Sequence, residues 1–144
     1  MVSQKERIER LGSVRLFEGL TKTDLKHLVG ISKVVDHEAD HTVVSEGESG
    51  AGFHLILAGE AKVVRGNKTL ARLGPGDFFG EMALIDSGPR TATVVGDGPL
   101  TTLAITAWDF RPLVKTRPDL AWKLLVHLTK RLREEQEGRD ALLA

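Results

Sequence analysis

The sequence predicts a mainly β protein, a compact antiparallel roll of short strands with helices on both flanks. Two observations support this prediction. Eleven of the 15 glycines fall between Gly47 and Gly98, where they separate short stretches rich in Val, Ile, Leu, Thr and Phe. This spacing is typical of short strands joined by tight turns. Both flanks are poor in glycine, and their apolar residues recur with the spacing of a helix.

Composition limits the class of protein. The 144 residues match the commonest size of a single domain, so residues 1–144 are expected to form one. The 20 Lys and Arg balance the 20 Asp and Glu, which excludes the strongly basic surface typical of nucleic-acid or anionic-membrane binding. Cysteine is absent, which excludes disulfides and thiolate chemistry. No apolar run resembles a signal peptide or reaches the roughly 18 residues of a membrane span, so we expect a cytoplasmic protein.

Two short helices are expected in residues 1–32. Ile8 and Leu11 follow a charged N-terminal stretch, and the segment FEGLTKTDLKHLVG offers Thr21 or Thr23 as a helix cap.

The strands are expected in residues 33–106. Five stretches there are short, apolar and bounded by Gly or Pro: FHLILAG, EAKVVRG, KTLARLG, TATVVG and LTTLAIT. The pair Gly66-Asn67 suits a tight hairpin turn. Gly74-Pro75-Gly76-Asp77 suits a type II turn, because proline presets φ and glycine accepts a positive φ.

Helices are expected again in residues 107–137. Thr106 can cap the segment AWDFRPLVKTR, and Pro118 suits the first turn of a longer helix that ends near Gln136. An apolar stripe of this helix contains Leu120, Leu124, Leu128 and Leu132, and it is widened by Trp122, Leu125 and Val126. Because the stripe is wider than one sheet face covers, we expect the helix to contact both the roll and a symmetric partner helix.

One stretch of the strand region, FGEMALIDSGPRTATV at residues 79–94, breaks the strand pattern. Its segment GEMALIDSG has the pattern of one helical turn between Gly80 and Gly88, and the first N–H groups of such a turn attract anions. Arg90 adds a guanidinium suited to phosphate oxygens. Glu81 would repel a bare polyanion, but it can accept a hydrogen bond from a sugar hydroxyl. These features predict a nucleotide with a single phosphate, since a triphosphate would call for a lysine-bearing phosphate loop.

This stretch resembles the phosphate-binding cassette of the cyclic nucleotide-binding domain family. The resemblance extends along residues 14–136 and includes LFEGLT, VSEGESG and GPGDFFGE. It implies an eight-stranded antiparallel jelly roll with N-terminal helices, a cassette at residues 79–92 and a C-terminal helical lid. The ligand-binding residues that it implies are Phe79, Gly80, Glu81, Met82, Ala83, Pro89, Arg90, Thr91 and Ala92.

The resemblance also implies a role for most of these residues. The backbone N–H groups of Gly80 and Ala83 and the side chain of Arg90 would bind the cyclic phosphate. Glu81 would accept a hydrogen bond from the ribose 2′-OH. The residues bordering phosphate and base would be Thr91 and Ala92. The expected ligand is cAMP, with cGMP as the alternative because a threonine at position 91 suits either base, and no other cofactor is expected.

The predicted function is therefore a sensor in which ligand binding repositions the C-terminal helix. The output would be a homodimer formed through that helix or the control of an effector protein. The polar residues that could close over the base are Arg131, Arg133, Glu135 and Gln136.

Alternatives remain open. A degenerate domain could serve as a protein-interaction module without ligand, with Glu81 and Arg90 forming only a structural ion pair. A cupin-like metalloenzyme would use His37 and His41 of DHEADH, but these lie four residues apart, whereas that class has two histidines one residue apart and a glutamate shortly after. The remaining histidines are scattered and are interpreted as structural or surface residues: His27, His54 and His127.

Two functional classes are not expected. No nucleophile, base and orienting acid recur at a recognisable spacing, so the chain is not predicted to be an enzyme or to hold a metal. Direct DNA binding is not predicted either, because the segment EGRDALLA that follows the long helix is too short to supply a reading helix.

Overall fold

The computed structural model describes residues 2–48, 52–86 and 88–143. The helical elements are α1 (Gln4–Gly12), the 3-10 turn η1 (Arg15–Phe17), α2 (Lys22–Gly30), the 3-10 turn η2 (Met82–Leu84), α3 (Ala107–Thr116) and α4 (Pro118–Leu143). The strands are β1 (Lys33–His37), β2 (Thr42–Val44), β3 (Gly52–Arg65), β4 (Lys68–Leu73), β5 (Phe78–Phe79) and β6 (Thr93–Thr106).

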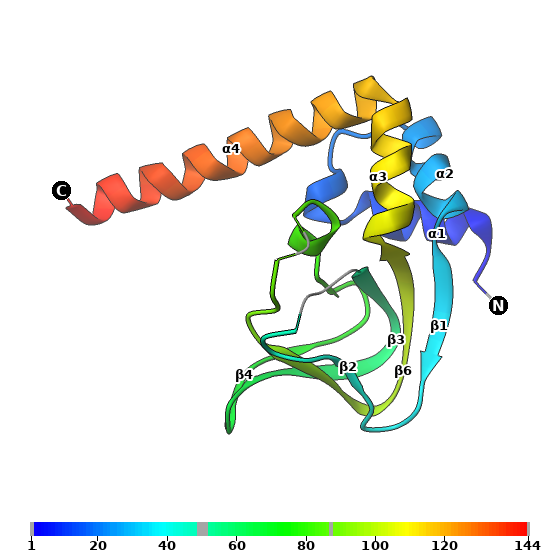
Figure 1. Ribbon diagram of the computed structural model, residues 1–144, viewed down its shortest axis with the longest axis vertical. Helices are drawn as coiled ribbons and strands as arrows, with labels where there is room; N and C mark the ends of the chain where they lie inside the picture. The colour runs from blue at the N-terminus through cyan, green and yellow to red at the C-terminus, as the bar shows by residue number, and fades with distance from the viewer. Residues whose placement is uncertain (1, 49–51, 87, 144) are drawn as a thin grey trace.

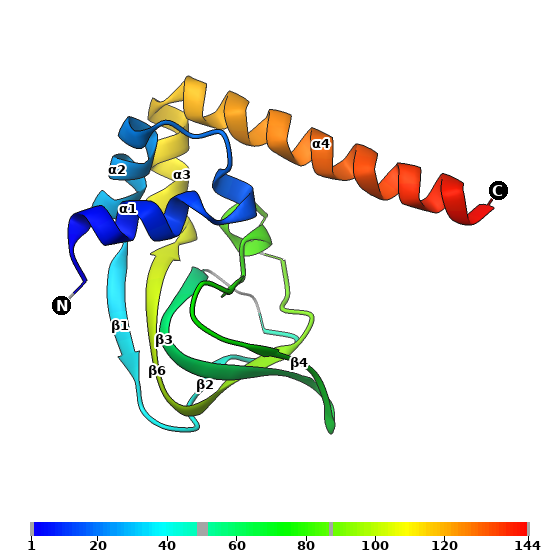
Figure 2. The ribbon, with the colours of Figure 1, turned by 180° about the vertical axis from the view of Figure 1, so that it is seen from behind.

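The strands form one antiparallel sheet that curls into an open roll, and α1, α2 and α3 gather at one end of it (Figures 1 and 2). The main strand order is β1-β6-β3-β4, with β2 also paired to β6 and β5 paired to β3. The predicted fold class, a mainly β roll with flanking helices, is confirmed.

The strand count differs from the eight that the resemblance implies, because the described residues form six strands. β3 and β6 are each 14 residues long, where the sequence pattern suggests two shorter strands on either side of a glycine. Gly59 at φ 87° and Gly98 at φ 84° let each strand bend without ending. The β3–β6 register shifts at this bend, between Ile56 and Glu60. If β3 and β6 are each counted as two halves, the number of strands equals the eight that the resemblance implies.

The predicted turns are present. Gly66, at φ 59°, lies in the two-residue turn between the paired residues Arg65 and Lys68. Gly76 has φ 92°, and the Asp77 N–H donates to the Gly74 carbonyl at 3.0 Å, as a type II turn requires.

The predicted helix caps are present, but the predicted end of the last helix is not. Thr21, rather than Thr23, caps α2 in a capping box with Asp24. Thr106 caps α3 as predicted. The expected end of the last helix near Gln136 is wrong, because α4 continues to Leu143. Gly138 costs only about 1 kcal/mol relative to alanine, and the charged and apolar residues around it are good helix formers.

Two apolar clusters form the core. The larger one lies between the sheet and the helices, where Phe17 and Phe53 meet edge to face with centroids 5.6 Å apart. The smaller one lies inside the roll and consists of Ile56, Ala61, Phe79, Val94 and Leu100.

From its start beside α3, α4 runs away from the roll, so that the last turns of this helix lie far from the strands (Figure 1). Leu120 and Leu124 belong to the larger core cluster, whereas Trp122, Leu125 and Leu132 are exposed. None of the helices within the described ranges is long and apolar enough to cross a membrane. A cytoplasmic location remains a prediction.

Candidate ligand-binding site

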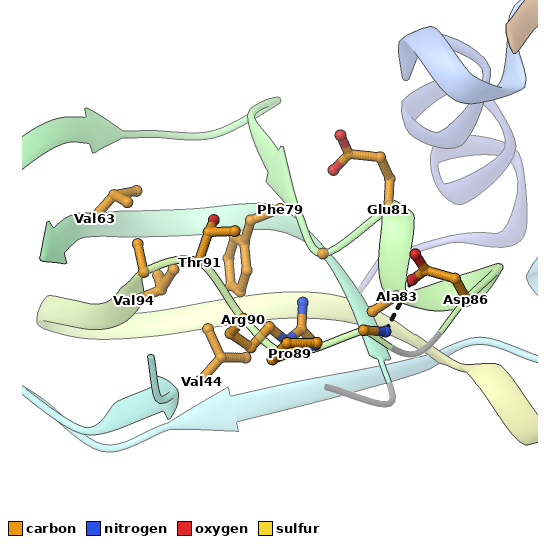
Figure 3. Close-up of a pocket in the computed structure, with 13 residues that line it drawn as sticks. Val44, Val63, Phe79, Glu81, Ala83, Asp86, Pro89, Arg90, Thr91 and Val94 are labelled. Atoms are coloured by element: carbon orange, nitrogen blue, oxygen red, sulfur yellow. Dashed lines mark hydrogen bonds between the residues drawn. The ribbon is translucent and has the colours of Figure 1, made fainter. Parts of the chain in front are cut away.

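A cavity of about 420 Å³ opens between the 79–92 segment and the strands of the roll (Figure 3). Its size falls within the range of small-molecule sites, about 300–1,000 Å³. Eight of the nine residues predicted to bind ligand line it: Phe79, Gly80, Glu81, Ala83, Pro89, Arg90, Thr91 and Ala92. The ninth, Met82, lies in η2, and its side chain is outside the described part of the structure. Ser87 of this stretch, and Ser49 and Gly50 of the VSEGESG motif, are also outside the described residues.

Arg90 is fixed from both its backbone and its side chain. Its N–H donates to the Glu48 carbonyl at 2.9 Å, and its own carbonyl accepts from the Gly47 N–H at 2.9 Å. Its Nη2 donates to the Gly52 carbonyl. Among the described residues, however, nothing accepts a hydrogen bond from its buried Nε. The guanidinium is therefore anchored at the wall of the cavity while one of its donors is unused.

Gly80 allows the cassette backbone to approach this guanidinium. Its φ is 82°, a left-handed conformation that side chains rarely adopt. A Cβ added at this position would collide with the Arg90 guanidinium and with the Gly52 carbonyl oxygen. The close approach therefore requires glycine at this position.

Glu81 and Arg90 do not pair with each other. The Glu81 side chain points away from Arg90 (Figure 3), and the ion pairs found within the described ranges do not join the two. Burial lowers the pKa of the Arg90 guanidinium, and the Glu81 carboxylate partly opposes this change. The alternative in which these residues form a structural ion pair is therefore not what the described side chains show.

The predicted helical turn is present as η2. The Ala83 N–H donates to the Gly80 carbonyl at 3.1 Å within this turn. The N–H group that the resemblance implies for phosphate binding is thus engaged inside the cassette, and a ligand would have to share or replace this hydrogen bond.

The apolar wall of the cavity was not predicted as part of the site. It consists of Val44 of β2, Val63 of β3 and Val94 of β6, beside Phe79. Together these side chains form an apolar surface of the kind that lines small-molecule sites. Thr91 is exposed, and its carbonyl accepts a hydrogen bond from Arg65 Nε at 3.0 Å.

The four residues expected to close over the base do not line this cavity. Arg131 and Glu135 of α4 line a second cavity of about 440 Å³, where Glu81 and Arg15 are also found. Glu81 thus borders both cavities. Arg133 and Gln136 are exposed and line neither of them.

The two histidines of DHEADH lie close together. The rings of His37 and His41 stack with centroids 5.9 Å apart. Within the described part of the chain, no group of three or more His, Cys, Asp or Glu side chains could hold a metal ion.

Comparisons with known proteins identify related sequences and structures. A family model described as "Cyclic nucleotide-binding domain" matches residues 34–117. The "CRP-like cAMP-activated global transcriptional regulator" of Mycobacterium tuberculosis is 31% identical over 140 residues, which cover 94% of this chain and 62% of that protein. The chain thus spans about three fifths of the length of that relative.

Two further matches extend the comparison. A "cGMP-dependent protein kinase" of Plasmodium berghei is 41% identical over 80 residues, which cover 56% of this chain and 9% of the kinase. The crystal structure of the N-terminal domain of a transcriptional regulator from Streptomyces coelicolor superposes with a TM-score of 0.83 at 28% identity, covering 92% of this chain and 94% of that one.

Proposed function

The chain belongs to the cyclic nucleotide-binding domain family, and from that premise we propose that it senses a cyclic nucleotide in the cavity beside Arg90. The observation that carries this proposal is the environment of the Arg90 side chain. Its guanidinium is anchored on the Gly52 carbonyl, it keeps a buried Nε without a partner among the described residues, and the bare backbone of Gly80 lies against it. An anion with oxygens in several directions would satisfy this unused donor.

The remaining contacts follow from the walls of the cavity. The cyclic phosphate would bind Arg90 and the cassette backbone at Gly80. The 2′-OH of the ribose would donate to Glu81, whose carboxylate is not paired with Arg90. The base would pack against the valine wall of Val44, Val63 and Val94. The two opposite charges of the cassette would thus serve different parts of one ligand.

We favour cAMP over cGMP as the ligand. The relative matched over 94% of this chain is named as cAMP-activated. The relative named as cGMP-dependent is matched over 56% of it. Exposed Thr91 is compatible with both bases, so the ratio of the two affinities must be measured.

The proposed output is a change in the position of α4. An equilibrium between two positions shifts only if the ligand favours one of them. Glu81 borders both the ligand cavity and the cavity lined by Arg131 and Glu135 of α4, so a ligand that engages Glu81 would also change the surroundings of α4. We expect the exposed side chains of α4 to form a homodimer or to meet an effector protein. This role is regulatory rather than catalytic.

The test is calorimetric titration with cAMP and with cGMP on the wild type and on Arg90→Ala and Glu81→Gln. Each variant removes one charge-assisted contact, worth about 2–3 kcal/mol, so we expect affinity to fall about 30-fold or more. Arg72→Ala and Glu60→Gln are matched controls, because Arg72 pairs with Asp97 on the exposed surface and Glu60 is exposed on β3.

Three results would count against the proposal. Tight binding that survives both cassette substitutions would refute the site. Equal losses in the control variants would mean that the effect is not local. No binding at millimolar nucleotide would favour the alternative, an interaction module that has lost its ligand.

A further inference from the structure

A row of side chains on the inner face of the roll ends next to Gly52, whose carbonyl accepts a hydrogen bond from Arg90. It consists of His37 of β1, Thr102 of β6, His54 of β3 and Phe79 of β5, and we call it the histidine row. His54 is directly opposite Phe79 in the β3–β5 ladder, and the two rings stack with centroids 5.0 Å apart and an angle of 15° between them.

Thr102 links the two histidines. Its hydroxyl oxygen is 3.0 Å from His37 Nε2 and 3.0 Å from His54 Nδ1, and the residue is fully buried. A hydroxyl has one proton to donate and two lone pairs with which to accept. It can therefore donate to one ring while accepting from the other. If both rings were charged, both would donate to it, and its own proton would need a third partner.

The surroundings of the two rings decide which one is charged first. Burial, followed by the charges of His37 and Arg90, lowers the pKa of His54 to about 4. Burial and His41 also lower the pKa of His37, but Asp36 opposes this. His37 therefore takes up a proton first and donates from Nε2 to Thr102. Thr102 then donates to His54 Nδ1, which leaves the proton of neutral His54 on Nε2.

His54 Nε2 lies next to Gly52. It is 4.0 Å from the position that a Cβ on Gly52 would occupy, and the Gly52 carbonyl is the acceptor that anchors Arg90. A positive charge on His54 would therefore lie next to the Gly52 carbonyl that binds the positively charged Arg90 side chain. Neutral His54 avoids this repulsion and supports the anchor.

We propose that His54 is a positioning residue for Arg90 and that binding of a phosphate anion at Arg90 is coupled to proton uptake by His54. This inference rests on the proposed nucleotide site. An anion paired with Arg90 would neutralise the charge that His54 faces across Gly52. Protonation of His54 would then cost less in the complex than in the free protein.

The charged neighbours of His54 are few. Among the described residues they are His37 from β1, with His41 and Asp36 behind it, and Arg90 from the cassette, with Glu81 acting on it. The sides formed by β5 and β6 contribute Phe79 and Thr102, which carry no charge. Only Arg90 among these groups would meet the phosphate directly, so it carries the coupling.

The direction of the pH effect follows from linkage. A group whose pKa is higher in the complex than in the free protein makes binding tighter as pH falls. The pKa of His54 in the free protein is about 4. If the bound anion raises it by about one unit, affinity should be about twofold higher at pH 5 than at pH 7, with a limit of about tenfold below pH 4.

The first test needs no ligand. Long-range ¹H–¹⁵N spectra of the free wild type, recorded at a pH where His37 is charged and His54 is not, should show His54 with its proton on Nε2 and with a pKa well below the value for free histidine. In Thr102→Val, which is nearly isosteric but lacks the hydroxyl, the His54 signal should lose this fixed tautomer. A proton on Nδ1, or a His54 pKa near 6.5, the value for free histidine, would overturn the proposed positioning role of His54.

The second test measures cAMP affinity by calorimetry between pH 7 and pH 4.5, in two buffers of different ionisation enthalpy. The wild type should gain affinity and take up protons as pH falls. His54→Phe retains a ring against Phe79 and should lose the pH dependence, whereas the surface control His27→Phe should retain it. Binding that does not change with pH would overturn this inference alone. No binding at any pH would overturn the proposed function as well.

Discussion

Asp24 Oδ2 accepts a hydrogen bond from Lys123 Nζ at 2.8 Å and thereby joins α2 to α4 across 99 positions of the chain. The same carboxylate accepts from the Thr21 N–H at 3.0 Å and lies 3.7 Å from Arg117 Nη2. The Asp24 side chain is only 3% exposed. One buried acid therefore caps a helix and fixes the beginning of the helix proposed to move.

We predict that Asp24→Asn lowers the free energy of unfolding by about 2 kcal/mol. Removing one partner of a buried ion pair leaves the other charge without compensation, which costs about 3–5 kcal/mol when both are buried. Lys123 is one-third exposed, so water replaces part of the lost contact. Urea denaturation followed by circular dichroism measures the change. The control is Glu6→Gln, which breaks a partly exposed i,i+4 pair with Arg10 and should cost less than about 0.5 kcal/mol. Equal losses would show that Asp24 does not hold α4.

The stabilising effect of Asp24 should disappear in acid. Burial alone raises the pKa of this carboxyl, but hydrogen bonds from Lys123 and Thr21 outweigh it and lower the pKa to about 2. Because the folded pKa lies below the unfolded value of 3.8, the stabilisation is complete above about pH 4 and is lost as pH falls toward 2. The difference in stability between wild type and Asp24→Asn should therefore shrink across this window in urea titrations. A constant difference from pH 5 to pH 2 would contradict the assignment.

Gly80→Ala should damage the ligand site more than it damages the fold. The substitution places a Cβ at φ 82° and drives it into the Arg90 guanidinium. Gly76→Ala is the matched control, because its φ is 92° and an added Cβ would meet nothing within 4 Å. Both variants should lose about 1 kcal/mol of stability from the strained backbone, and Gly80→Ala should lose more because its Cβ also collides with the Gly52 carbonyl oxygen. Only Gly80→Ala should lose nucleotide affinity, by tenfold or more, in the same calorimetric titration. Equal affinity in the two variants would mean that the close approach at Gly80 does not matter for binding.

The part of the site that could be predicted from the sequence is the part that is continuous in the chain. Gly80, Glu81 and Arg90 lie within one short stretch, and their chemistry is visible without knowledge of the fold. The valine wall comes from three strands. Val44, Val63 and Val94 are brought together by strand register, which composition and turn signals do not determine.

Contacts between residues far apart in the chain also explain where the structure differs from the sequence predictions. His54 looked like a scattered histidine because its neighbours, His37 and Thr102, are 17 and 48 positions away and meet it only through the sheet. The contact between Asp24 and Lys123 joins α4 to α2 across 99 positions of the chain, and no local sequence pattern predicts it. The sheet has six strands rather than eight because glycines that usually separate strands bend β3 and β6 without ending them.

Leu125→Glu should weaken self-association if α4 forms the proposed dimer. Leu125 is 57% exposed on α4, and placing a carboxylate in an apolar interface is costly because it must be desolvated without a partner. Leu70→Glu is the matched control, because Leu70 is also an exposed leucine, at 43%, but lies on β4. Sedimentation velocity with and without cAMP should show a dimer for the wild type and Leu70→Glu, and a monomer for Leu125→Glu. If all three proteins sediment as monomers, the symmetric-partner hypothesis is wrong and an effector protein is the remaining candidate.

Arg131→Ala and Arg133→Ala should show which arginine of α4 influences nucleotide binding. Arg131 lines the cavity that also contains Glu81, whereas Arg133 is exposed two residues further along the same helix and lines neither cavity. A cation near Glu81 competes with the ribose hydroxyl for this carboxylate in the present position of α4, and it would face the ligand if α4 closed. Nucleotide affinity should therefore change in Arg131→Ala, by about threefold to tenfold as expected for a partly exposed charge, and should stay unchanged in Arg133→Ala. The sign of the change is informative, since a gain in affinity indicates competition for Glu81 and a loss indicates a closing contact with the ligand. Equal effects of the two substitutions would show that α4 influences binding only through its net charge.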